Sequence, residues 1–225
     1  MSQTLSDSGV YVGEPLNEAW DLLPPEDMYE ACRVIARHVR YLGDLTWDFS
    51  ELGRVPIAPE FTRLIKSYLS VVLSSDAPRK GWKIPETALC YPWIVRMFPE
   101  AYYIHWVRDP RDCIIGSHVT DDLSRFRVPY DKPEDDVRLM RAISWKYQRE
   151  IAKATPEPER MIRIRFEDFV LRQDETLARL EDFLGIPMAK IPVRRDPIGR
   201  WKTDAGVHYF DFFEDDLREL GYELP

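Results

Sequence analysis

The segment Tyr102–Ser117, YYIHWVRDPRDCIIGS, combines a strand pattern, a turn and a helix start. Its apolar part, Tyr102–Val107, is typical of a buried strand, and Arg108 follows directly. Asp109-Pro110 then turns the chain, and a helix is expected to begin immediately after this turn. In open parallel sheets, ligands bind at the carboxyl ends of the strands. We therefore expect Arg108 to face a ligand crevice.

The residue types after this strand favour an anionic ligand. A planar guanidinium binds phosphate through two parallel hydrogen bonds, and a helix start adds free N–H groups and positive dipole. Arg108 and Arg111 are candidate phosphate ligands, and Ser117 is a candidate hydroxyl donor. The alternative is that Arg108 pairs with Asp112 and only stabilises the turn.

Working outward, short apolar runs alternate with helical segments on both sides. Further strands are expected over Lys80–Ile84 and Met161–Phe166. Helices are expected over Pro25–Leu42, Pro59–Leu73, Pro92–Met97, Pro133–Thr155 and Asp174–Leu184, with a short one in the sequence EDDLREL near the end. Strands that alternate with helical crossovers predict an α/β fold with a parallel sheet and helices on both faces.

Composition limits the class of protein. The 225 residues suit one domain, and 44% hydrophobic with 31% charged residues is the balance of a soluble globular protein. The 31 basic and 39 acidic residues give a net charge of −8, which argues against a nucleic-acid partner because phosphate backbones recruit an excess of Lys and Arg. A small anion in one local basic pocket is compatible with this charge.

Cysteine spacing and apolar runs indicate the compartment. Cys32, Cys90 and Cys113 form no CxxC pair, so neither a disulfide framework nor a zinc site is predicted, and a reducing compartment is expected. The acidic pairs have no histidine at ligand spacing, so no metal is expected. The N-terminus lacks a basic start with an apolar core, and no membrane span is found. We expect a cytoplasmic protein.

Several segments resemble, in the same order, those of sulfotransferases that use 3′-phosphoadenosine-5′-phosphosulfate (PAPS). Tyr102–Ser117 resembles the segment that binds the 3′-phosphate in this family. The other matching segments, within roughly residues 80–202, are GWKIP at Gly81–Pro85, FPEA at Phe98–Ala101, RFEDF at Arg165–Phe169, the helix exit at Leu180–Ile186 and GRWK at Gly199–Lys202. The GRWK loop closes over the nucleotide in that family.

The resemblance implies a P-loop-NTPase-like parallel sheet flanked by helices, the sulfotransferase fold. It also implies transfer of a sulfuryl group from PAPS to a hydroxyl or amine of a small-molecule, glycan or lipid acceptor, without a metal. The nucleotide ligands implied are Arg108, Ser117, Arg111, Arg200, Trp201 and Lys202, with Arg195 in the same basic loop. The alternative for Arg195, Arg200, Trp201 and Lys202 is an ordinary solvated basic loop.

The resemblance also suggests residues for the acceptor side. Lys83 is a candidate ligand of the sulfate or the acceptor, with an ion pair to Glu86 as the alternative. Glu18 is the first candidate for the base that takes the acceptor proton, and Glu14 is the second. His118 is a further candidate base. The alternative for all three is a solvated or capping side chain.

Two features depart from the family pattern. The serine of the family lies eight positions after the arginine, where this chain has Gly116, and Ser117 is ninth. The Gly/Ser/Thr-rich loop that binds the 5′-phosphosulfate has no counterpart in the sequence, because Met1–Gly13 resembles the helix and strand that follow it. We expect the missing first strand and loop to lie immediately upstream of Met1.

These matches divide a single domain into four parts. Residues 1–24 follow the missing loop, residues 25–79 form a helical region, residues 80–202 form the 3′-phosphate-binding core and residues 203–225 form a tail. Two other functions stay open. One is a catalytically inactive module that binds PAPS or its product or serves assembly, and the other is a nucleotide-dependent phosphotransferase, against which the absent G-x-x-x-x-G-K-[ST] motif argues.

Overall fold

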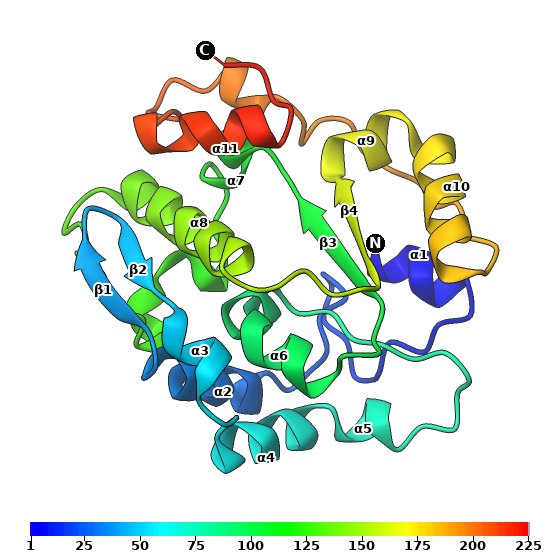
Figure 1. Cartoon of the computed structure of the whole chain (residues 1–225). Helices are drawn as coiled ribbons and strands as arrows, with labels where there is room; N and C mark the ends of the chain where they lie inside the picture. The colour runs from blue at the N-terminus through cyan, green and yellow to red at the C-terminus, as the bar shows by residue number, and fades with distance from the viewer. Residues whose placement is uncertain (225) are drawn as a thin grey trace.

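Two parallel strands, β3 (Tyr103–Val107) and β4 (Met161–Arg165), lie at the centre of the computed structural model, which describes residues 1–224 (Figure 1). They pair in register from Tyr103 opposite Met161 to Val107 opposite Arg165. Apolar runs rich in β-branched and aromatic residues favour these strands, as the sequence predicts. Their carboxyl ends lie level with each other, so the residues that follow them meet at one edge.

Helices cover both faces of this pair, which confirms the predicted mixed α/β class. On one face, strand residues such as Trp106 and Ile164 pack with α1 (Ser2–Asp7), α9 (Phe166–Leu171) and α10 (Gln173–Leu184). On the other face, Val107 packs with residues of α8 (Val137–Lys153) and α11 (Glu214–Glu219), next to α7 (Pro110–Cys113). The strand ends are therefore enclosed by α7, α9 and α11 (Figure 1).

A larger hydrophobic core lies away from the sheet, where aromatic side chains meet. Trp93 and Phe61 are fully buried there, with ring centroids 5.0 Å apart in an edge-to-face arrangement. The elements around this core are α2 (Glu26–Ala36), α3 (Ser50–Arg54), α4 (Pro59–Tyr68), α5 (Ser70–Leu73), α6 (Tyr91–Met97) and the 3₁₀ turns η1 (Pro85–Cys90) and η3 (Leu123–Phe126). The remaining 3₁₀ turns are η2 (Val119–Asp121), η4 (Arg200–Lys202) and η5 (Asp211–Phe213).

The predicted helix Pro25–Leu42 is too long, because its last part is a hairpin. The helix ends at Ala36, and β1 (Arg40–Gly43) pairs antiparallel with β2 (Thr46–Asp48). Three consecutive residues from Gly43 to Leu45 have positive φ, which reverses the chain. The rings of Tyr41 and Trp47 stabilise the hairpin, with centroids 5.5 Å apart.

Other boundaries also differ from the prediction. The strand predicted over Lys80–Ile84 amounts to one parallel bridge between Tyr11 and Lys80. The long helix begins at Val137, because the Asp136 carboxylate accepts a hydrogen bond from the N–H of Leu139 at 2.8 Å and caps it. Within residues 1–224, β3 has no strand partner on the edge that faces away from β4. None of the described helices is both long and apolar enough to cross a membrane.

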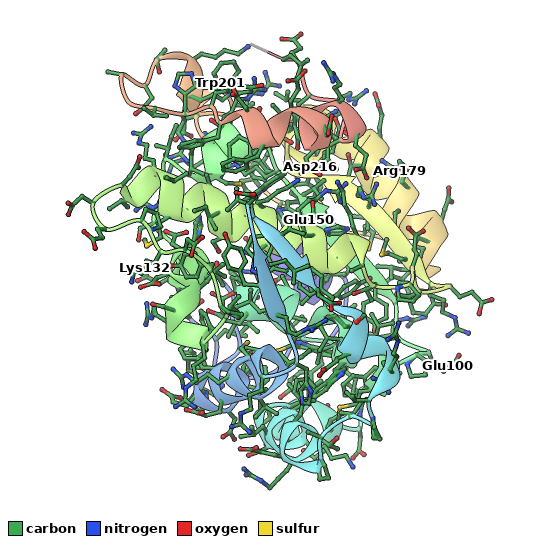
Figure 2. All side chains as sticks on the ribbon, turned by 60° about the vertical axis from the view of Figure 1, so that its left-hand side comes forward. Glu100, Lys132, Glu150, Arg179, Trp201 and Asp216 are labelled. Atoms are coloured by element: carbon green, nitrogen blue, oxygen red, sulfur yellow. The ribbon has the colours of Figure 1, made fainter. Side chains whose placement is uncertain are left out.

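Besides its apolar packing, the C-terminal helix holds a buried carboxylate that binds α8. Asp216 on α11 is fully buried against α8, the helix that bears Glu150 (Figure 2). Its oxygens bind Lys146 at 2.8 Å and Arg149 at 3.2 Å, and Lys153 is a third partner. Although burial opposes ionisation, these hydrogen bonds hold the pKa of Asp216 below its usual range. The carboxylate is therefore charged in the folded protein.

We predict that Asp216→Asn lowers the free energy of unfolding by about 3–5 kcal/mol, because it leaves three cations beside a buried neutral amide. Denaturant unfolding at pH 7 measures this loss. The wild-type contribution is present above the unfolded aspartate pKa of about 4 and is lost as the pH falls through the lower folded value. Asp215→Asn is the control, since its side chain is 92% exposed; equal losses in the two variants would contradict the prediction.

Candidate functional site

The turn after β3 is fixed by a buried ion pair. The Asp109 carboxylate accepts the backbone N–H of Arg111 at 2.9 Å and binds its guanidinium at 2.9 Å (Nε to Oδ1) and 2.8 Å (Nη2 to Oδ2). The two residues are only 6% and 2% exposed. Such a bidentate pair is geometrically specific, and losing either partner would leave a buried charge. The turn therefore has one defined conformation.

A second carboxylate connects this turn to the end of β4. Glu167, in the first turn of α9, accepts the backbone N–H of Asp109 at 3.0 Å through Oε1. Its Oε2 accepts the hydroxyl of Tyr222 at 2.8 Å. Burial and the nearby Glu167 raise the pKa of the Tyr222 phenol, so it remains a donor. Together these bonds join the ends of both strands to the C-terminal segment.

Asp112 holds the loop at residues 199–202 over the turn. Its Oδ2 accepts the N–H of Gly199 at 2.7 Å, and its Oδ1 accepts the N–H of Trp201 at 3.1 Å. Gly199 has a φ of 70°, a conformation that favours glycine. The guanidinium carbon of Arg111 lies 3.9 Å from the Trp201 ring centroid. Figure 2 shows Trp201 on this loop, above α11.

Arg108 has a different environment from Arg111. Its Nη2 donates to the carbonyl of Pro197 at 2.5 Å, its guanidinium lies 4.7 Å from the Phe166 ring centroid, and its Nε is buried without a partner. No carboxylate among residues 1–224 is within salt-bridge distance of it. The alternative of an ion pair with Asp112 is wrong, because the Asp112 oxygens bind the N–H groups of the loop.

Two further cations lie on the 199–202 loop, which follows the Pro197 carbonyl that Arg108 contacts. Arg200 donates to the carbonyl of Asp112 at 3.0 Å and has a buried Nε without a partner. Lys202 lies 5.5 Å from the Trp201 ring centroid. In the described part of the chain, neither Arg200 nor Lys202 forms a salt bridge with a carboxylate. The site thus contains three cations, Arg108, Arg200 and Lys202, whose charge is not compensated by a paired side chain.

Gly116, where the resemblance places a serine, faces Arg200. A Cβ atom added at Gly116 would lie 3.9 Å from Nη2 of Arg200 and 3.8 Å from Nε2 of His118. Ser117 is exposed. His118 is exposed, and its backbone N–H donates to the carboxylate of Asp121 at 2.8 Å. The structure therefore brings Gly116, Arg200 and His118 together.

The acceptor-side candidates lie on a separate loop. Nζ of Lys83 lies 2.5 Å from Oδ1 of Asp21, so the alternative of an ion pair with Glu86 is wrong. Glu14 and Glu18 are both exposed on the loop that leads to Asp21. Glu86 is instead 1% exposed, and burial raises the pKa of its carboxyl group. Lys83, from the segment before η1, thus contacts the end of the loop that bears the two candidate bases, through Asp21 and the carbonyl of Ala19.

Sequence reasoning named these cations as candidates but did not predict the hydrogen bonds that Asp109, Asp112 and Glu167 make around them. Asp109 follows a strand and precedes proline and arginine, which is a helix-cap pattern that could have indicated its role. Glu167 lies inside the RFEDF match. The binding of Asp112 to Gly199 joins residues 87 positions apart, so no local pattern contains it. No group of three or more potential metal ligands occurs within residues 1–224.

We predict that Asp112→Ala releases the 199–202 loop. The backbone N–H groups of Gly199 and Trp201 lose their acceptor, and an unsatisfied donor costs about 1–3 kcal/mol, which corresponds to roughly 5- to 150-fold faster amide exchange. Hydrogen exchange measured by mass spectrometry on peptides that contain residues 197–203 checks this. Asp196→Ala is the control from the segment just before the loop, since its ion pair with Arg194 is exposed. Unchanged exchange in Asp112→Ala would refute the role of Asp112.

Comparisons with known proteins identify the family of this chain. A model of the sulfotransferase family matches residues 14–190. A Caenorhabditis elegans protein named "Putative protein-tyrosine sulfotransferase" is 28% identical over 191 residues, which cover 73% of this chain and 71% of that protein. Among solved structures, the sulfotransferase domain from the curacin biosynthetic pathway aligns with a TM-score of 0.53 at 20% identity, over 73% of this chain and 69% of that one.

The two kinds of comparison support different statements. At 20% identity, the structural likeness establishes the fold alone. The family model, in contrast, covers well over half of the chain and includes the β3 turn with Arg108. The chain therefore belongs to the sulfotransferase family.

Proposed function

We propose that this protein transfers the sulfuryl group of PAPS to an acceptor hydroxyl or amine. We also propose that the turn after β3, together with residues 195–202, binds the 3′-phosphate of the nucleotide. The observation that supports this most directly is the set of cations without carboxylate partners: Arg108, Arg200 and Lys202. A partly buried guanidinium that lacks a counter-ion has lost hydration, which an anionic ligand can replace with charge-assisted hydrogen bonds. Arg111, whose charge Asp109 compensates, forms a rigid support beside them.

Each residue has a proposed role at the nucleotide. Arg108 and Arg200 bind the 3′-phosphate, with Lys202 and Arg195 at the solvent side. One face of the Trp201 ring contacts the Arg111 guanidinium, and the opposite face covers the adenine. Ser117 and Arg111 are weaker candidates for a phosphate contact, because Ser117 points to solvent and Arg111 already binds Asp109.

The proposed chemistry is an in-line displacement at sulfur. The acceptor oxygen or nitrogen attacks the sulfur, the bond between the sulfur and the oxygen of the 5′-phosphate breaks, and adenosine 3′,5′-bisphosphate leaves with the electron pair. By analogy with phosphoryl transfer, the protein contributes positioning and charge neutralisation. Lys83 would neutralise charge on the sulfuryl oxygens, and Glu18, or Glu14, would take the acceptor proton, with His118 as the other candidate base.

The fold proposed for this activity has one more parallel strand next to β3, followed by the loop that binds the 5′-phosphosulfate. The unpaired edge of β3 supports this placement, since peptide groups inside a domain are normally hydrogen bonded. For the acceptor, the name of the C. elegans relative suggests a phenolic hydroxyl, so tyrosine-containing peptides and simple phenols are the first acceptors to assay.

We predict that Arg108→Ala weakens binding of adenosine 3′,5′-bisphosphate by about 1.5–3 kcal/mol, which is roughly 10- to 150-fold in Kd. Binding of adenosine 5′-monophosphate should change much less, because it lacks the 3′-phosphate. Isothermal titration calorimetry with both ligands measures the difference. Arg194→Ala is the control, since Arg194 is exposed and paired with Asp196; equal losses for the two nucleotides would reject the assignment.

We predict that Glu18→Gln lowers kcat at least about 100-fold and leaves nucleotide affinity nearly unchanged, because general-base catalysis contributes roughly 10²–10⁴ in rate. A sulfate-transfer assay with PAPS, together with calorimetry, checks both quantities. If Glu14→Gln shows the loss and Glu18→Gln does not, Glu14 is the base. Normal turnover in both variants would show that neither Glu14 nor Glu18 takes the acceptor proton. If the wild-type protein binds the nucleotide but transfers no sulfate, the alternative of a catalytically inactive binding module is supported.

A further inference from the structure

Two cysteines that are distant in sequence meet inside the large core. Cys32 is on α2 and Cys90 is the last residue of η1, 58 positions later. Their Sγ atoms are 3.2 Å apart, and the residues are 1% and 0% exposed. The sequence spacing gave no indication of this pair. The third cysteine, Cys113, lies after β3, where its thiol is 4.0 Å from the carbonyl of Arg108.

The distance is short enough for a covalent bond with little movement. A disulfide has an S–S length of about 2.05 Å, so the two sulfur atoms of Cys32 and Cys90 would have to approach by roughly 1.1 Å. Cys90 is where η1 ends and α6 begins, and side-chain rotation at such a junction can supply a shift of this size.

The surroundings of the pair argue against other uses of the thiols. The Cys32 thiol donates to the carbonyl of Glu86 at 3.5 Å, and the Tyr147 hydroxyl nearby is buried without a partner. Burial raises the pKa of Cys32 well above its usual value, so neither thiolate chemistry nor ligand exchange is favoured in the folded state. No set of three or more metal ligands occurs among the described residues.

We propose that Cys32 and Cys90 form an intramolecular disulfide when the chain folds in the presence of a disulfide oxidant such as oxidised glutathione. One cysteine thiolate attacks a sulfur of the oxidant and releases one glutathione thiolate. The second cysteine then attacks the mixed disulfide and releases the other. The two thiol protons end on the two glutathione molecules, so the protein loses two hydrogen atoms and two electrons.

The proposed bond would have a structural effect that does not depend on sulfate transfer. It would connect α2 covalently to η1, the turn that directly follows Lys83-Ile84. Closing a loop of this length restricts the unfolded chain and therefore favours the folded one. Because the sulfur atoms are buried, reductants would reach the bond only when the core opens, so it should persist in the folded protein.

The test is to refold the full chain in glutathione buffers of different redox ratio, alkylate free thiols under denaturing conditions and map the peptides. Before alkylation, the oxidised chain is expected to be lighter than the fully reduced chain by two hydrogen atoms. After alkylation, the map should show a peptide pair joined through Cys32 and Cys90, with Cys113 alkylated. The oxidised form should melt about 5–10 °C higher than the form reduced with dithiothreitol. Cys113→Ser is the matched control and should behave like the wild type in both measurements.

Mapping the wild-type chain keeps the test independent of variants that fold poorly. The double variant Cys32→Ser/Cys90→Ser should show the same melting temperature with and without reductant, whatever its absolute stability. The proposal is overturned if natively folded chains from oxidised glutathione have both thiols alkylated, or if the disulfides found involve Cys113. A Cys32–Cys90 bond that occurs only in chains without the native circular dichroism spectrum would overturn it as well.

Discussion

The ion pair between Asp109 and Arg111 is the constraint on which the rest of the site depends. It is buried at the carboxyl end of β3, and removal of either charge would leave the other without a partner in a medium of low polarity. The backbone N–H of Asp109 binds Glu167 after β4, and the guanidinium of Arg111 supports the ring of Trp201. One pair thus sets the relative positions of both strand ends and of the loop above them.

The distribution of charge around this pair gives the site its chemistry. Asp109 and Asp112 are used internally, one by a guanidinium and the other by N–H groups of the 199–202 loop. The cations Arg108, Arg200 and Lys202 consequently have no carboxylate partner within the described residues. A protein with an overall charge of −8 therefore has a local site suited to a small anion, which the net charge alone would not suggest.

Short sequence patterns were enough to predict the two parallel strands and the turn after β3. The strands at Tyr103–Val107 and Met161–Arg165 and the cation Arg108 at the strand end followed from apolar runs and from the turn at Asp109. The first strand of the 40–48 hairpin was missed because residues 40–42 continue the helical pattern of Pro25–Leu42, and the cross-strand contact of Tyr41 with Trp47 decides for a strand. Contacts across the chain, such as Lys83 with Asp21, have no local pattern, so they could not be predicted.

The account rests on a site that recognises a 3′-phosphate, and the most direct measurement compares two mononucleotides that differ only in where the phosphate is attached. Calorimetric titration of the wild-type protein with adenosine 3′-monophosphate and with adenosine 5′-monophosphate measures how much more a 3′-phosphate contributes to binding than a 5′-phosphate of the same charge. We predict that the 3′-isomer binds more tightly by at least about 10-fold, the effect of one good charge-assisted contact. Equal affinities, or a preference for the 5′-isomer, would contradict the placement of the 3′-phosphate at Arg108.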